Sequence, residues 1–258
     1  MNILRLNTLA LLVSSMCCAS SYASDHINTR AMQPKIATIN PINPNLDPTP
    51  YLLPKNHRLK PILDKIFAKP SVVDTPRNFI AAGFSTLYIR PKGSLRVARH
   101  PAANGYLFKL YLTSETNAQK AVWQNSLVQR CVGAAAIQKL IKEQKLRHIT
   151  VPEKWLYELP ATAKSVDKTY VVVTQDMNLV SRKQTKKSWK RASPSLLREL
   201  HALLKSGNSS MALVQNIPFT KNGTCSCIDT EFAPRKFHLK RVKKFFSPKV
   251  HKYWDTLQ

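Results

Sequence analysis

An α+β fold is expected for this 258-residue chain, because strand-like and helix-like segments are separated along it. The texture is strand-like from Phe79 onward, and the clearest strand, 105–112, alternates with a period of two. A longer segment, 117–145, is helical in texture, and leucines form a continuous stripe from Leu196 to Leu204. A small sheet that is followed by helices accounts for these three observations.

The first 24 residues have the parts of a secretory signal. Arg5 gives a charged start, a short apolar run covers Leu9 to Ser15, and Ser21 and Ala23 place small residues at the positions that a signal peptidase reads. We expect cleavage after Ala23 or Ser24 and export of the chain, into the periplasm or medium or into another cell. An N-terminal membrane anchor is the alternative, although a span needs about 20 apolar residues. No stable transmembrane span is expected after cleavage.

Residues 25–57 are expected to form an extended linker or a poorly ordered arm, because prolines interrupt them without periodicity. These prolines are Pro34, Pro41, Pro44, Pro48, Pro50 and Pro54. The remaining stretch, roughly 200 residues, is long enough for one sizeable domain or two small lobes.

Short elements open the folded part of the chain. A helix is predicted over 58–67, where apolar residues share one face. Strands are predicted over 79–89, 96–99 and 105–112. In the last strand Lys109 lies on one face with Leu107 and Tyr111, and Phe108 and Leu110 lie on the other. Taken alone, a strand lysine is more often at an edge or facing solvent than in a binding site.

The long helix predicted over 117–145 is followed by two strand candidates, 149–159 and 168–176. The second contains the β-branched run Tyr170-Val-Val-Val-Thr174, which is typical of a buried strand. Arg130 and Gly133 interrupt the apolar face of the long helix, and the sequence assigns no role to either.

A basic patch at 183–191 has Trp189 embedded in it. Cations around an exposed aromatic ring can bind phosphates while the ring stacks on a base, but such a run is more often a solvated loop, which we expect here. Ser193 and Pro194 then open the leucine-striped helix, and Gly207 ends it.

The tail after Glu231 is basic and aromatic. We expect a helix that covers the folded part with Phe237, Val242 and Phe245 inward. Attachment of the tail to an anionic surface is the alternative.

The charge of the chain is extreme, at +26 from 40 Lys and Arg against 14 Asp and Glu. Such a balance favours an anionic partner, which could be a phosphorylated ligand, nucleic acid, anionic lipid or an acidic protein surface. Charge alone does not choose among them, and a basic surface that only keeps the protein soluble is the alternative.

The cysteines indicate neither a disulfide framework nor a zinc site. Without the signal the chain keeps Cys131, Cys225 and Cys227, an odd number that gives no disulfide framework. Cys225 and Cys227 alternate with a serine and are expected to pack as small apolar residues. No Cys and His spacing matches a zinc site.

The segment from Asn216 to Glu231 predicts a hairpin that holds an amide and a carboxylate together. Two short apolar pieces flank Lys221-Asn222-Gly223, and Asn-Gly is a strong turn signal. Folding back there brings Asn216 and Asp229 to the same end of a ribbon. Amide and carboxylate oxygens are ligands that suit Mg²⁺, which is often shared with a phosphate.

This hairpin resembles the metal-binding hairpin of the protein-kinase-like superfamily, especially its aminoglycoside-phosphotransferase-like branch. The resemblance covers roughly residues 79–231 and implies a bilobal fold, with an antiparallel sheet and the long helix in an N-lobe over 58–176 and a reduced helical C-lobe with a basic tail over 177–258. It also implies that Asn216 and Asp229 bind Mg²⁺ and that Lys109 stands where the lysine of the third kinase strand contacts ATP phosphates.

The resemblance is to a degenerate and truncated member. Met211 stands where the catalytic Asp is expected, the long helix has no acidic residue between Glu115 and Glu143 to pair with Lys109, and no glycine-rich loop is evident. No catalytic residue is therefore assigned. Positioning and charge neutralisation supply most of phosphoryl-transfer catalysis, so these losses disfavour activity without excluding it.

Three hypotheses follow for function. The first is an exported pseudokinase that binds ATP or a phosphorylated ligand, with Mg²⁺, and engages an anionic partner through its basic surface. The second is a secreted basic binding module without a nucleotide site. The third is an active small-molecule phosphotransferase, ATP-dependent, that uses Glu231 or another carboxylate as its base.

Overall fold

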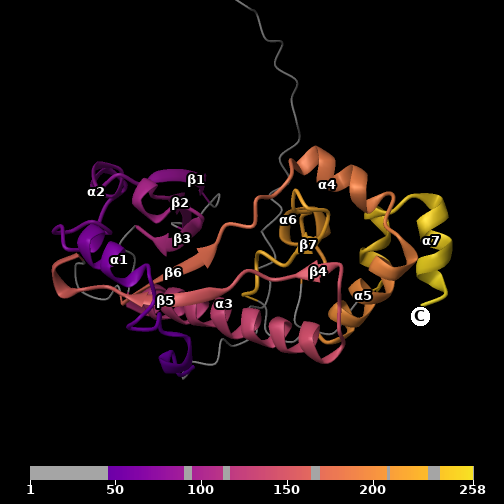
Figure 1. Ribbon diagram of the computed structural model, residues 1–258, viewed down its shortest axis with the longest axis horizontal. Coiled ribbons are helices and arrows are strands. Elements are labelled where there is room, and N and C mark those ends of the chain that lie inside the picture. The colour runs from indigo at the N-terminus through magenta and orange to yellow at the C-terminus, as the bar shows by residue number, and fades with distance from the viewer. Residues whose placement is uncertain are drawn as a thin grey trace, which may run out of the picture. The chain divides into compact units, whose positions relative to one another are not determined.

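A five-stranded antiparallel sheet forms the first part of the folded chain, and most of the helices follow it (Figure 1). The computed structural model describes residues 46–89, 95–112, 117–163, 169–207, 210–231 and 239–257, all within the unit Ile39–Gln258. The strands are β1 (Ser85–Ile89), β2 (Leu95–Arg99), β3 (Tyr106–Tyr111), β5 (Lys154–Glu158) and β6 (Tyr170–Gln175), in the spatial order β1-β2-β3-β6-β5. The predicted α+β fold, with an antiparallel sheet before the main helical part, is confirmed.

Strand β3 lies in the middle of this sheet, between β2 and β6. Lys109 is paired with Val97 on one side and Val172 on the other, so it is neither on an edge strand nor facing solvent. Phe108 and Leu110 point to the opposite face, where they belong to another apolar cluster. The predicted alternation of this strand is therefore confirmed.

One face of the sheet is covered by α1 (Lys60–Phe67) and α2 (Pro76–Ala81). The helix predicted over 58–67 is confirmed as α1. The strand predicted over 79–89 is wrong in its first part, because Phe79 lies in α2. The Thr75 side chain accepts from the Asn78 backbone N–H and Pro76 opens the helix, so local capping overrides the strand-like texture.

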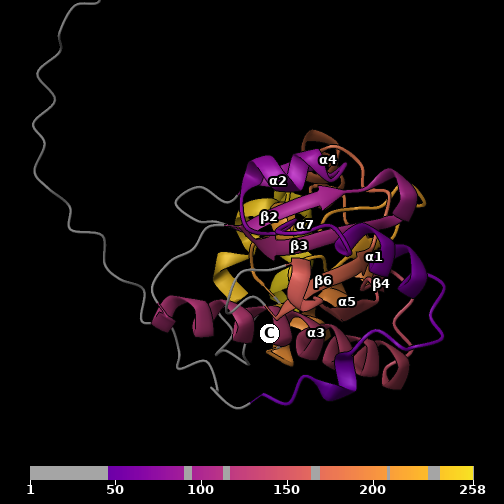
Figure 2. The ribbon, with the colours of Figure 1, turned by 90° about the vertical axis from the view of Figure 1, so that its left-hand side faces the viewer.

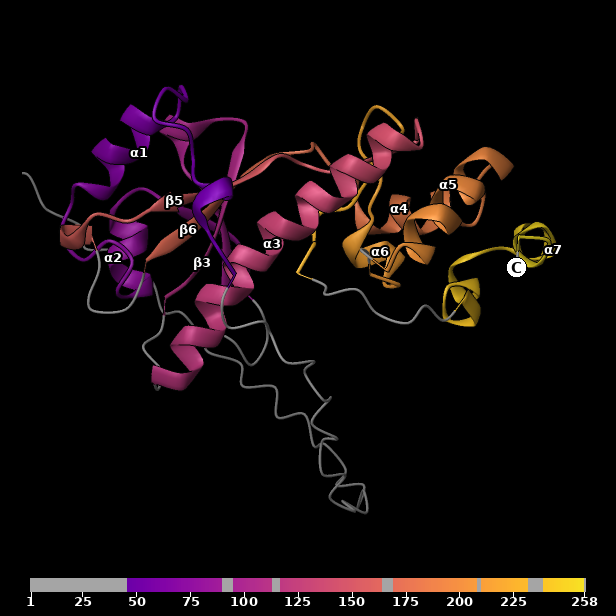
Figure 3. The same ribbon diagram turned by 90° about the horizontal axis from the view of Figure 1, so that it is seen from below.

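The other face of the sheet packs against the long helix α3 (Asn117–Glu143). Figure 2 shows α2 and α3 on opposite sides of β2 and β3, and Figure 3 shows α3 continuing from the sheet to the helical elements. Near its end α3 contacts β4 (Ile149–Thr150), which pairs in parallel with β7 (Cys225–Ser226). The strand predicted over 149–159 is divided into β4 and β5.

The helical part is built on the leucine stripe of α5. Its helices are α4 (Arg182–Trp189), α5 (Pro194–Lys205), α6 (Leu213–Asn216) and α7 (Pro248–Asp255). The prediction for α5 is confirmed, because Ser193 caps it, its leucines are buried and Gly207 follows it with a φ of 76°. Cys225 and Cys227 are buried in the same apolar cluster, as predicted.

The basic patch at 183–191 is a helix and not the expected solvated loop. Ser181 forms a capping box with Gln184, and this starts α4. Trp189 is fully buried, which removes the suggested stacking of a base on an exposed ring.

The chain after residue 238 packs as two 3₁₀ turns, η4 (Leu239–Arg241) and η5 (Lys243–Phe245), and then α7. Val242 is buried as predicted, whereas Phe245 is only partly buried, and Trp254 of α7 fills the apolar cluster. Pro248 opens a new helix here, so the tail is not one continuous helix. Phe237 lies outside the described residues.

The N-terminal segments are described only from residue 46. The signal predicted for residues 1–24 and most of the proline-rich arm lie outside this range. The end of the arm forms the 3₁₀ turn η1 (Thr49–Tyr51), and Leu53 donates its backbone N–H to the Leu156 carbonyl oxygen at 2.8 Å. Among the described residues, no helix combines the length and apolar character that a membrane crossing requires.

Candidate functional site

The predicted hairpin is present and ends beside the sheet. The Ile228 N–H donates to the Asn216 carbonyl oxygen at 3.0 Å, and the Ser226 N–H donates to the Pro218 carbonyl oxygen at 2.8 Å. The turn closes with a 2.8 Å bond from the Thr220 backbone N–H to the Thr224 carbonyl oxygen. These three bonds bring Asn216 and Asp229 to the same end of the ribbon, as the sequence predicts.

Two lysines of the sheet reach this end of the ribbon. Lys109 of β3 donates to the Ile228 carbonyl oxygen at 2.9 Å. Lys154 of β5 donates to the same oxygen at 3.1 Å and to the Thr230 hydroxyl at 2.6 Å. The lysines are only 8% and 7% exposed, so a single backbone carbonyl is held between two buried ammonium groups.

An arginine of the long helix binds the two acids of the ribbon. Arg130 of α3 is 2% exposed, and its two terminal nitrogens donate separately to Asp229 Oδ1 and Glu231 Oε2. Asp229 and Glu231 keep 31% and 24% of their side chains exposed. We call Lys109, Arg130, Lys154, Asp229 and Glu231 the Asp229 cluster.

Gly133 explains how the ribbon comes so close to α3. A Cβ at this position would lie 2.0 Å from the Thr230 carbonyl oxygen, which is far inside van der Waals contact. The Thr230 hydroxyl also donates to the Arg130 carbonyl oxygen. Glycine costs roughly 1 kcal/mol in a helix interior relative to alanine. Here that cost allows the segment Ile228–Glu231 to lie directly on the helix backbone.

A second group of hydroxyls extends the cluster along α3. The Ser126 hydroxyl donates to Glu231 Oε1, and the Tyr111 hydroxyl lies 3.1 Å from the Ser126 oxygen. Glu231 is therefore held from both sides, by Arg130 and by Ser126. An acid with both oxygens engaged is poorly placed to accept a proton from a substrate.

Burial and neighbouring charges shift the pKa values of the cluster. Burial lowers the pKa of Lys109 to about 8, with help from the Arg130 charge and against the opposing effect of Asp229. Burial also lowers the pKa of Lys154 well below its usual value. Burial alone would raise the pKa of Asp229, but the charges of Arg130, Lys109 and Lys154 and the Arg130 hydrogen bond together outweigh burial and keep that pKa below its ordinary value. The carboxylate is therefore ionised and the lysines are the groups that lose protons first.

The side chains of two residues expected in a kinase-like site contact other groups. The Asn216 side chain donates to the Ser210 hydroxyl at 2.8 Å, at the end of α6. Met211 packs against the apolar cluster of the helical part and has no group that accepts a proton. Among the described residues, no side chain replaces the missing catalytic Asp at that position.

A magnesium ion fits these residues poorly. One oxygen of Asp229 already accepts from Arg130, and Lys109 and Lys154 bring two further cations to the same ribbon. A divalent ion between Asn216 and Asp229 would share its carboxylate with a guanidinium. Within the described part of the chain, no cluster of three His, Cys, Asp or Glu side chains could hold a metal ion. The assignment of Asn216 and Asp229 as metal ligands stays a prediction.

No protein-family model matches the chain, and no curated protein is similar to it in sequence. Among solved structures it is similar to the MAP kinase LmaMPK10 from Leishmania major, with a TM-score of 0.29 and 12% identity over 61% of this chain. The similar region spans 50% of that kinase.

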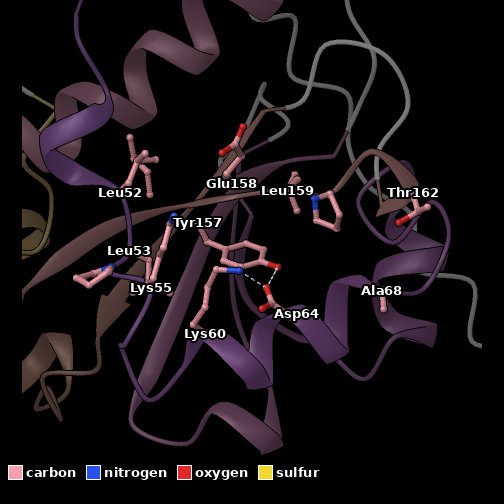
Figure 4. Close-up of a pocket in the computed structure, with 13 residues that line it drawn as sticks. Leu52, Leu53, Lys55, Lys60, Asp64, Ala68, Tyr157, Glu158, Leu159 and Thr162 are labelled. Atoms are coloured by element: carbon pink, nitrogen blue, oxygen red, sulfur yellow. Dashed lines mark hydrogen bonds and ion pairs between the residues drawn. The ribbon is translucent and has the colours of Figure 1, made fainter.

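A separate cavity of about 790 Å³ lies between α1, the edge strand β5 and the segment Leu52–Lys55. On its wall the Tyr157 hydroxyl donates to Asp64 Oδ1 at 2.8 Å, and Lys60 binds the same oxygen (Figure 4). Two lysines and two acids line this cavity. Their formal charges cancel, so the lining favours neither an anionic nor a cationic ligand.

Sequence reasoning missed Arg130 and Lys154 as members of the site. Arg130 gave a signal, because a charged residue on an apolar helix face needs a partner when it is buried. The nearby Gly133 gave another, because a glycine inside a helix often marks a close approach. The sequence signal for Lys154 was weaker: like Lys109, it is a lysine in a strand beside apolar residues.

Proposed function

We propose that this chain is an exported pseudokinase, a kinase-like protein that does not transfer phosphate and acts by binding an anionic partner. Its elements follow the order that the resemblance implies: a strand lysine, a long helix, a buried strand, a leucine-striped helix, Asn216, a hairpin and Asp229. The observation that carries the proposal is the position of Arg130, which pairs with Asp229 and Glu231 at the same time.

We expect no phosphate transfer, because the residues that would bind the metal ions and orient the nucleophile are missing or already engaged. Phosphoryl transfer needs metal ions to neutralise developing charge and a residue to orient the nucleophile. Arg130 competes with a metal for Asp229, Ser126 and Arg130 hold Glu231, and Met211 replaces the base. These features disfavour the alternative of an active phosphotransferase that uses Glu231.

A nucleotide or phosphorylated ligand, in this proposal, binds at Lys109 without Mg²⁺. Among the described residues, Lys109 and Lys154 together hold one backbone carbonyl and one hydroxyl, so their charges are balanced mainly by the two acids of the cluster. A phosphate is the kind of group that could replace the carbonyl between two ammonium ions.

A thermal-shift titration tests this proposal. We expect ATP to raise the melting temperature equally in excess Mg²⁺ and in EDTA, by mass action on the native state. Lys109→Met should abolish the shift, while Asp229→Asn should leave it in place. We also expect no time-dependent loss of ATP when a small-molecule acceptor is added.

Other results would point to the alternatives. A shift that needs Mg²⁺ and disappears in Asp229→Asn would restore the metal site of the resemblance. Loss of ATP that is absent in Lys109→Ala would identify an active phosphotransferase. If ATP produces no shift under any condition while a polyanion binds, the chain is a basic binding module without a nucleotide site.

A further inference from the structure

Helix α4 carries an unusual concentration of positive charge. Residues 182–191 contain six cations and no acid, and all six cations are exposed. They are Arg182, Lys183, Lys186, Lys187, Lys190 and Arg191, and we call them the α4 basic face. Because successive residues turn by about 100° around a helix, the four cations inside α4 fall on one half of its surface, and Lys190 and Arg191 directly follow its last residue.

The opposite half of α4 is fixed to the protein. Thr185 and Trp189 are fully buried, and the Trp189 ring nitrogen donates to the Ile217 carbonyl oxygen at 3.1 Å. The Trp189 ring also contacts Phe219 edge-on, with centroids 5.0 Å apart. Helix α4 therefore packs on the hairpin and lies beside α6 (Figure 1), while the cations of its basic face are exposed.

The basic face is unfavourable for the isolated protein. Each cation from Arg182 to Lys187 has another cation four residues later, and like charges at this spacing repel each other. Arg182 and Lys183 also lie in the first turn, where the helix dipole disfavours positive charge. In the described ranges of the chain, no ion pair joins any of the six to an acid. An anionic partner would relieve this repulsion.

The chemistry of the exposed residues favours a hydrated polyanion over a membrane. Helices that bind membranes insert an apolar face between lipids. The apolar face of α4 is instead occupied by Trp189 against the hairpin, and the outward positions hold only charged or polar residues. A nucleic-acid duplex carries one phosphate per roughly 3.4 Å of each strand. Helix α4 is about 12 Å long, so several phosphates of one strand can lie along its row of cations.

We propose that the α4 basic face is a binding surface for nucleic acid, which it contacts through phosphates without reading base sequence. Lysine ammonium groups act as point charges on phosphates. The one amide on this helix, Gln184, accepts from the Ser181 N–H in the capping box and is not free to read a base. This inference rests on the proposed function, of which it specifies the anionic partner.

Fluorescence anisotropy with a labelled 20-base-pair duplex tests this inference on the full mature chain. The test variant is the triple substitution K183Q/K186Q/K190Q, and the matched control is K65Q/K69Q/R77Q, which removes three exposed cations near α1 and α2. We expect the test variant to bind roughly tenfold more weakly at 0.1 M NaCl and to lower the slope of log K against log salt by about 3. The control should bind like wild type.

Several outcomes would overturn the inference. These are equal weakening in both variants, unchanged binding in the test variant, preference for one duplex sequence over a shuffled one, and tighter binding to vesicles of phosphatidylserine and phosphatidylcholine than to DNA. Unchanged melting temperatures would show that both variants fold. Neither variant touches the Asp229 cluster, so the ATP titration and this assay can fail independently.

Discussion

Arg130 determines which groups the buried charges around Lys109 bind. Helix α3 supplies a guanidinium to two acids of the ribbon. The lysines are left to bind the ribbon backbone. The five charges of the Asp229 cluster thus hold the ribbon against both α3 and the sheet.

Gly133 lies where the ribbon meets the backbone of α3. Alanine normally stabilises a helix interior by roughly 1 kcal/mol relative to glycine. Because the new methyl group would collide with the Thr230 carbonyl oxygen, we expect Gly133→Ala to destabilise the protein by about 2 kcal/mol. Urea denaturation measures the difference.

Ala136→Gly in the same helix is the control for helix propensity. It should cost about 1 kcal/mol, so that the two substitutions in opposite directions both destabilise. A stabilised Gly133→Ala protein would mean that the ribbon does not lie on the helix as described.

Lys109 gives a prediction about pH. Its folded pKa of about 8 is below its ordinary value of 10.5, so between these pH values the unfolded chain binds the proton and the native protein does not. The stability contribution of Lys109 therefore rises with pH in this window, by up to about 3 kcal/mol in total. Unfolding free energies from pH 7 to 10.5 should rise more steeply for wild type than for Lys109→Met, and parallel curves would contradict the assignment.

Helix α4 shows what local sequence patterns can and cannot predict. Its composition suggested a solvated loop, because no apolar stripe marks it as a helix. The signal that decides is the pair Ser181 and Gln184, three residues apart, which closes a capping box. Helix α5 was predictable because cap, stripe and terminal glycine all agree, and α2 was missed because Thr75 and Pro76 outweigh the strand-like residues that follow.

The cap of α4 is testable by itself. We expect Ser181→Ala to destabilise the protein by about 1 kcal/mol, because the Gln184 backbone N–H loses its acceptor. Ser188→Ala in the same helix removes a hydroxyl without a cap and should change stability by less than about 0.5 kcal/mol. Thermal denaturation of both variants makes the comparison, and equal effects would argue against the capping box.

Helix α3 contributes to two apolar clusters: Leu127, Val128 and Cys131 pack with residues of the sheet, and Ala134 and Ile137 pack with the helical elements and the hairpin. The sequence predicts the elements of each, because periodicity and caps are local. It also predicts the convergence of Lys109 with the Asp229 ribbon, through the resemblance. It does not predict that Arg130 takes the acid, because that pairing joins residues 99 positions apart and depends on a glycine contact that only the assembled chain shows.

The cooperativity of the two clusters is expected to depend on Arg130. Arg130→Met should cost about 3 kcal/mol, because it leaves two partly buried acids unpaired. Native-state hydrogen exchange should then show separate opening free energies for β6 and α5, which in wild type should open together.

Arg99→Met is the matched control, since it breaks an exposed ion pair with Asp176. Such a pair contributes about 1 kcal/mol or less, so exchange in β6 and α5 should stay coupled. Separation in both variants, or in neither, would contradict a specific role for Arg130.

The shared carbonyl of Ile228 also bears on how the chain folds. Lys109, which donates to this carbonyl, lies 119 residues earlier in the sequence. The contact therefore cannot form until nearly the entire polypeptide is available. Contacts of such long range tend to form late and to slow folding. Bonds that are absent from the transition state retard unfolding instead of accelerating folding, so the buried lysines should act chiefly by prolonging the lifetime of the native state.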